Sequence, residues 1–148
     1  MTRKWWTLGV VSVATFMLLL DITVVNTALP AIQEDLGASF TELQWVVDAY
    51  TLTLAAFVLT AGSLADRLGR RRIFAAGLAI FSISSLAAGL AGDPTTLNVA
   101  RAVQGIGGGA MFAVSLALIA QEFPAGRERG QAMGIYGATI GAAVAVGP

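Results

Sequence analysis

Five long apolar runs, separated by short polar connections, are the strongest constraint on how this chain can fold. The runs cover approximately residues 7–29, 45–64, 73–91, 97–120 and 131–148. Each has about the 20 residues that an α-helix needs to cross the ~30 Å hydrocarbon core of a membrane. They are continuous blocks without the alternation of barrel strands, which excludes a closed β-barrel. We therefore predict one all-α, polytopic helical bundle of about five spans, the fifth incomplete where the sequence stops at Pro148.

The composition agrees with a membrane protein and excludes several functions. Hydrophobic residues make up 56% and charged residues 12% of the chain, whereas charged residues form about a quarter of a typical soluble domain. Nine basic and nine acidic residues cancel, but they are unevenly distributed, so the net charge says nothing about partners. From the apolar composition we expect lipid around the spans, and we expect no nucleic-acid partner. The sequence has no cysteine and no histidine, which rules out thiol chemistry and histidine-ligated metals. The sequence shows no arrangement of a nucleophile with a base that would indicate an enzyme. We expect neither a metal nor an organic cofactor.

The basic residues lie on one side of the predicted spans. All but Arg101 fall at the amino terminus, between the second and third runs, or between the fourth and fifth runs. These residues are Arg3, Lys4, Arg67, Arg70, Arg71, Arg72, Arg127 and Arg129. The connections 31–44 and 92–96 contain no lysine or arginine. By the positive-inside rule, the amino terminus is expected in the cytoplasm, with the chain in the plasma membrane.

The first run has two possible interpretations. A basic start followed by an apolar core also occurs in cleaved secretory signals. This run is too long for that, Asp21 interrupts it, and no Ala-x-Ala cleavage site follows. We therefore predict an uncleaved span that Pro30 closes, followed by an external loop from Ala31 to Gln44.

Three ionisable residues lie inside the predicted spans, where each is expensive to bury and is therefore a candidate functional residue. Asp21 is expected ~12 Å deep from the outer end of its helix, and Asp48 and Arg101 ~6 Å deep. Because an arginine stays protonated, Arg101 can compensate one carboxylate and leave the other to bind a proton or a cationic substrate. The sequence does not decide which aspartate pairs with Arg101. In the alternative interpretation, the shallow Asp48 and Arg101 only reach the membrane interface.

Several stretches, in the correct order, carry a resemblance to a known family. The stretch Gly62–Arg71 has the pattern Gly-x-Leu-Ala-Asp-Arg-x-Gly-Arg-Arg. The others are Leu20–Pro30, Gln44–Tyr50, the pattern Leu97-x-x-x-Arg101-x-x-Gln104-Gly105-x-Gly107, and the closing Gly147-Pro148. The chain resembles the major facilitator superfamily, in its drug:proton antiporter branch with fourteen spans. The last match is imperfect, since Ala143 stands where that pattern has a glycine.

The resemblance implies a proton-coupled exporter of hydrophobic or cationic small molecules such as drugs, with the proton gradient as its energy source. It also implies proton coupling at Arg101 and a conformational switch loop that contains Gly62, Asp66, Arg67, Gly69, Arg70 and Arg71. In that loop Gly62 would allow close helix approach, and Asp66 would form a charge network with Arg67 and Arg70. In the alternative interpretation, Asp66 and the arginines only enforce the orientation of the chain, as in any inner loop. Alternatives are an exporter of an endogenous metabolite or antibiotic, and a transport-incompetent fragment.

Glycines gather in the last two runs. The series Gly105 to Gly109 superficially resembles a dinucleotide-binding loop, but the required strand and βαβ unit are missing. In a membrane helix, small residues let backbones approach closely, so we assign Gly105, Gly137, Gly141 and Gly147 to helix packing. Pro148 can bend its helix, either as part of a gate or simply to shape the bundle.

The place where the sequence stops also suggests more chain. Gln131 to Pro148 would extend ~27 Å as a helix, almost the depth of the membrane core. We expect this to be the amino-terminal portion of a longer transporter, with a carboxy-terminal half as its partner. The alternative is a natural five-span protein.

Overall fold

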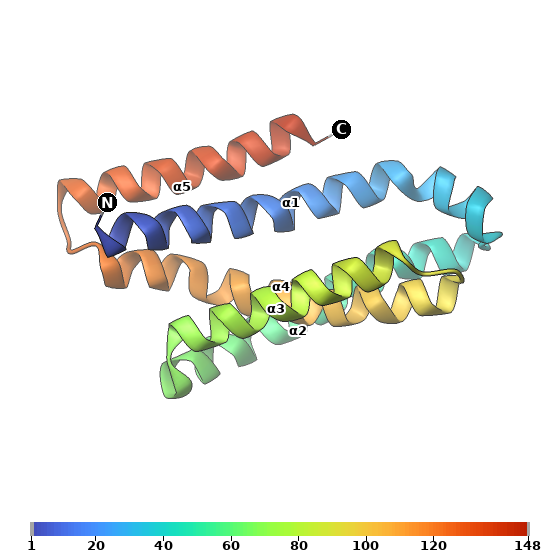
Figure 1. Cartoon of the computed structure of the whole chain (residues 1–148), viewed down its shortest axis with the longest axis horizontal. Helices are drawn as coiled ribbons and strands as arrows, with labels where there is room; N and C mark the ends of the chain where they lie inside the picture. Colours follow the sequence, from blue (N-terminus) through green and yellow to red (C-terminus); the bar gives the residue numbers. More distant parts are fainter. Residues whose placement is uncertain (1, 148) are drawn as a thin grey trace.

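The computed structural model describes residues 2–147, which form five long helices running back and forth along one axis (Figure 1). The helices are α1 (Arg3–Leu36), α2 (Phe40–Leu68), α3 (Arg70–Gly89), α4 (Pro94–Glu122) and α5 (Arg127–Val146). The predicted all-α fold class is confirmed. One end of the bundle carries the amino terminus, Gly69 and residues 123–126, and we call it the arginine end. The other carries residues 37–39 and 90–93, and we call it the opposite end.

In the described part of the chain, four helices, α1 to α4, are long and apolar enough to cross a membrane. We expected five spans, and α5 does not reach the same hydropathy. Its first three residues, Arg127 to Arg129, are charged, and glycines of low hydropathy recur along it.

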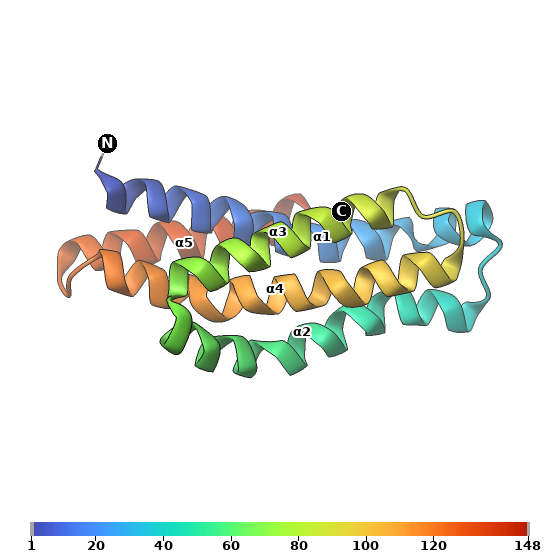
Figure 2. The same ribbon diagram turned by 60° about the horizontal axis from the view of Figure 1, so that its bottom comes forward.

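Helix α4 is the centre of the bundle. Helices α2 and α3 pack along it, whereas α5 packs mainly along α1 (Figure 2). Helices α1 and α5 are also joined by a buried contact between the hydroxyls of Thr15 in α1 and Tyr136 in α5, 3.2 Å apart. Burial is therefore greatest in α4, whose inward side chains include Met111, Val114 and Leu118.

Glycines of α4 allow its neighbours to approach closely. A Cβ atom on Gly105 would overlap the Thr53 hydroxyl and the Tyr50 carbonyl oxygen of α2. On the other side of α4, a Cβ on Gly107 would lie 2.6 Å from the Gly77 carbonyl oxygen of α3. Small residues thus bring three backbones together, as is usual where helices associate within a membrane.

Other glycines assigned to helix packing have different surroundings. A Cβ added to Gly62, Gly137 or Gly141 would meet no atom of the described residues within 4 Å, so helix packing at these positions stays a prediction. Within residues 2–147, no neighbouring helix covers the helix faces on which they lie. Gly147, in contrast, packs directly against the Thr23 side chain of α1. Pro148, the proposed gate residue, lies outside the described residues.

Pro30 does not end the first helix. It lies inside α1, which continues to Leu36 and ends at Gly37 with a left-handed φ of 62°. Proline lacks one backbone donor, but a membrane helix can continue through it when the freed carbonyl finds other partners. The connection to α2 is therefore residues 37–39, much shorter than the predicted loop 31–44. A capping box of Ser39 and Glu42 starts α2, and its Ser-x-x-Glu pattern was the signal that sequence reasoning missed.

The start of α4 is fixed by Asp93. Its carboxylate accepts hydrogen bonds from the Thr96 backbone N–H, at 2.8 Å, and from the Thr96 hydroxyl, at 2.6 Å. These two bonds lower the pKa of Asp93, because they favour its ionised form. Pro94 occupies the first turn, where its missing N–H is not needed.

Replacement of Gly105 by alanine should destabilise the protein by about 1–3 kcal/mol, the usual range for an overpacked site. The new methyl group would collide with backbone and side-chain atoms of α2. The unfolding midpoint of the purified protein in detergent measures the effect. Gly137→Ala is the matched control and should leave stability unchanged or raise it, since alanine favours helices and meets no neighbour. Equal midpoints for the two variants would contradict this packing.

Candidate functional site

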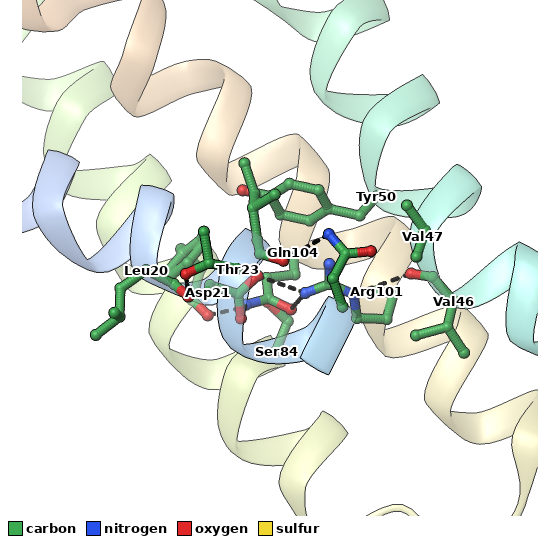
Figure 3. A network of polar contacts seen from close by, with 12 residues as sticks. Leu20, Asp21, Thr23, Val46, Val47, Tyr50, Ser84, Arg101 and Gln104 are labelled. Carbon is green, nitrogen blue, oxygen red and sulfur yellow. Dashed lines mark hydrogen bonds and ion pairs between the residues drawn. The ribbon is translucent and has the colours of Figure 1, made fainter. Parts of the chain in front are cut away.

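A closed ring of three polar side chains lies inside the bundle, between α1 and α4 (Figure 3). Arg101 Nη1 donates to Asp21 Oδ2 at 2.6 Å and to Gln104 Oε1 at 2.8 Å. Gln104 Nε2 in turn donates to Asp21 Oδ1 at 2.9 Å. Both carboxylate oxygens of Asp21 are thus held by residues of α4, 80 and 83 positions further along the chain.

Helix α2 completes the surroundings of Arg101. Arg101 Nε donates to the Val46 carbonyl oxygen at 3.1 Å, and its guanidinium carbon lies 4.2 Å from the centroid of the Tyr50 ring. Val46 and Tyr50 are four residues apart, so they share one face of α2. A cation above an aromatic face is attracted by the ring quadrupole. The guanidinium is therefore held by a carboxylate, an amide, a carbonyl and an aromatic ring, with only 2% of Arg101 exposed.

The ring is buried but reachable. Arg101 and Gln104 are almost fully buried, whereas 16% of the Asp21 side chain is exposed. All three line a cavity of about 440 Å³. The cavity runs between α1, α3 and α4 towards the opposite end, where Asp35 and Leu36 also line it. A charged pair that faces a cavity inside a membrane bundle is typical of proton and substrate pathways.

Asp48 lies apart from the ring. It lines a separate groove of about 460 Å³ between α1 and α2, together with Pro30 and Gln33. Asp48 is two positions from Val46 and from Tyr50, and this spacing turns its side chain to the other side of α2. The structure thus pairs Arg101 with Asp21, and the expected joint site of two carboxylates and one guanidinium does not form.

Sequence reasoning gave no role to two residues of this site, Gln104 and Tyr50. Gln104 follows Arg101 by three residues, one helical turn, and a buried amide on the same face as a charge was the available signal. Tyr50 contributes its ring to Arg101, and its buried hydroxyl has no hydrogen-bond partner among the described residues. The contact of Gln104 with Asp21 and that of Tyr50 with Arg101 each join two helices, so local spacing in the sequence could not predict them.

The predicted switch loop, at the arginine end, contains only part of the expected charge network. Arg70 lies 3.6 Å from Asp66, one turn away, and donates to the Ala117 carbonyl oxygen of α4 at 3.2 Å. Gly69 takes a φ of 99° and joins α2 to α3. Arg67 has no ion pair within residues 2–147.

Glu122, at the end of α4, extends this network beyond the expected residues. It forms ion pairs with Arg71 of α3 and with Arg3 of α1. Its side chain is only 10% exposed. Arg129 of α5 adds hydrogen bonds to the Ala120 and Phe123 carbonyl oxygens. Cations at the carboxyl end of a helix stabilise its dipole, so the arginine end is tied together around α4.

Removal of one member of the Asp21–Arg101 pair should destabilise the fold by about 3–5 kcal/mol, because the other charge stays buried without compensation. The single variants Asp21→Asn and Arg101→Gln should each show a loss, and the double variant should lose clearly less than their sum. The free energy of unfolding in detergent is measured for the parent, the two single variants and the double variant, which together form a double-mutant cycle. Arg72→Gln is a control, since Arg72 is exposed and forms no ion pair in the described chain. Additive losses would contradict a direct interaction.

Comparison with known proteins identifies the family. The chain is 50% identical, over 145 residues, to the puromycin resistance protein pur8 of Streptomyces alboniger, covering 98% of this chain and 29% of that protein. It is 42% identical to the tetracenomycin C resistance and export protein of Streptomyces glaucescens, covering 99% and 27%. It is 40% identical to the multidrug resistance protein Stp of Mycobacterium tuberculosis, covering 96% and 26%.

These relatives confirm the resemblance to drug exporters, and the chain spans less than a third of their length. The sequence model described as Major Facilitator Superfamily matches residues 11–148. Since that match covers nearly the whole chain, the protein belongs to the major facilitator superfamily, a family of membrane transporters.

Proposed function

We propose that the intact protein is a proton-coupled exporter, an antiporter that moves hydrophobic or cationic small molecules such as drugs out of the cell. The observation that carries this proposal is the buried Asp21–Arg101–Gln104 ring at the inner end of an open cavity. The names of its relatives, which speak of drug resistance and export, support the same class of substrate.

Asp21 is the group that exchanges one cation for another. Arg101 stays protonated in proteins, so only the carboxylate of the pair can change its charge. A proton on Asp21 breaks the ion pair and leaves Arg101 with only Val46, Gln104 and Tyr50. A cationic substrate in the cavity competes with that proton for the same carboxylate. Proton and substrate therefore bind in alternation, which is what an antiporter requires.

The same ion pair links binding to a change of conformation. Arg101 joins α4 to α2 through Val46, and to α1 through Asp21. Neutralising Asp21 leaves a buried cation uncompensated, and this favours an arrangement of α1 and α4 in which Arg101 is better solvated. Asp48, in its own groove between α1 and α2, is a second cation or proton site that works without Arg101.

The orientation is also part of the proposal. The arginine end is cytoplasmic and the opposite end is external, because basic residues collect at the former. In this arrangement the cavity that leads to Asp21 opens to the outside, where protons enter. The loop of Gly62, Asp66, Arg67, Gly69, Arg70 and Arg71 acts as the conformational switch.

Export of an antibiotic or an endogenous metabolite is the second candidate function. Two of the three relatives described above are named after a single compound, puromycin and tetracenomycin C, and this favours a narrow substrate over a broad set of drugs. A panel of cationic dyes and antibiotics, tested in the same proteoliposomes, separates a broad exporter from one that accepts a single compound.

Asp21→Asn should reduce proton-driven export about tenfold or more, since an amide can neither bind the proton nor attract the cation. The intact protein is reconstituted in proteoliposomes, and the loss of a cationic dye down an inward proton gradient is measured. Glu34→Gln, a neutralised and exposed acid on the same helix, serves as the control and should export normally. Undiminished export by Asp21→Asn would refute the proposed exchange.

Asp66→Asn should impair export while leaving membrane insertion and substrate binding intact. The change removes the carboxylate that lies 3.6 Å from Arg70 in the switch loop. Dye binding and dye efflux are measured on the same preparation, and only efflux is expected to fall. Arg72→Gln changes a neighbouring charge outside the network and should behave as the parent. A normal efflux rate in Asp66→Asn would argue against a switch role for this loop.

A further inference from the structure

The cavity that reaches Asp21 has an unbalanced charge at its mouth. Asp21 and Arg101 compensate each other at the inner end. Asp35 also lines the cavity, and within the described chain it forms no ion pair. The three charged groups that line the cavity therefore sum to one negative charge, and that charge lies at the mouth.

The position of Asp35 follows from the geometry of α1. It is 14 residues beyond Asp21, nearly four full helical turns, so both residues share one face and lie about 21 Å apart along the axis. This distance exceeds the Debye length of about 8 Å at physiological salt. Asp35 therefore acts on ions that enter the cavity, and has little direct effect on Asp21.

The surrounding backbone adds to the negative potential. The carboxyl ends of α1 and α3 both lie at this mouth, and neither has a basic residue in its last turn. The carbonyl groups at a helix end carry a partial negative charge. The amino ends of α2 and α4 are the opposing positive contributions, and acids cap both, Glu42 with Ser39 at α2 and Asp93 at α4. An acid in the last turn of α1 is unfavourable for that helix, so stability of α1 does not account for Asp35.

We propose that Asp35 is an entrance residue, whose carboxylate draws cations into the cavity that leads to Asp21 and disfavours anions. This inference rests on the proposed function, in which a proton and an organic cation are exchanged at Asp21. Both of these species are positively charged. Electrostatic steering of this kind raises association rates and weakens as salt increases.

A thiol introduced inside the cavity tests the entrance directly. The chain has no cysteine, and Ser85 of α3 lines the cavity and is partly exposed. The variant Ser85→Cys is made in the intact protein, with any cysteine elsewhere replaced, in membrane vesicles. Its modification rates are measured with a cationic trimethylammonium-ethyl methanethiosulfonate and with an anionic sulfonatoethyl methanethiosulfonate.

At low ionic strength, Asp35→Asn should lower the ratio of cationic to anionic rates by about three- to tenfold, and high salt should abolish the difference. Glu34→Gln is the matched control. Glu34 is the adjacent acid in the same last turn, is exposed, and does not line the cavity. It should change the ratio less than twofold.

Three results would overturn the inference. They are an unchanged ratio in Asp35→Asn, an equal change in Glu34→Gln, and a thiol at position 85 that neither reagent reaches. In dye export, Asp35→Asn should raise KM several-fold at low salt without a change in kcat. The labelling requires no transport, so an intact protein that labels as expected but exports nothing would refute the proposed function and leave the entrance in place.

Discussion

A guanidinium buried in an apolar bundle is the interaction on which the rest of this structure depends. Taking one charge out of water costs several kcal/mol, and attraction to a partner offsets this only when the geometry is good and the remaining donors are satisfied. Arg101 meets both conditions through Asp21, Gln104 and Val46. Its contacts come from α1, α2 and α4, and so these three helices must keep one relative register.

Close helix packing makes those contacts possible. Gly105 follows Gln104 directly, and its missing side chain lets α2 approach α4 at Tyr50. The same approach places the Tyr50 ring under Arg101 and the Val46 carbonyl within hydrogen-bond distance. The glycine-rich segment and the buried charge are therefore parts of one arrangement, since a wider separation of the helices would remove two of the partners of Arg101.

Sequence reasoning predicted the all-α fold and singled out Asp21 and Arg101, because long apolar runs and charges inside them depend on local composition alone. It failed where the answer depends on contacts between helices. It could not choose between Asp21 and Asp48 as the partner of Arg101, since the rotation of α2 about its axis separates Asp48 from the pair. It ended the first helix at Pro30, because the tolerance of proline depends on its surroundings. The roles proposed for the site residues remain predictions.

Pro30 has a mechanical consequence for α1. It lies between Asp21, which is fixed to α4, and Asp35 at the cavity mouth. The backbone hydrogen bond that proline cannot donate is missing at this point, so α1 bends more easily there than in its inner half. A bend at this point would move the last turns of α1, and with them one wall of the opening, while the Asp21 anchor stays in place.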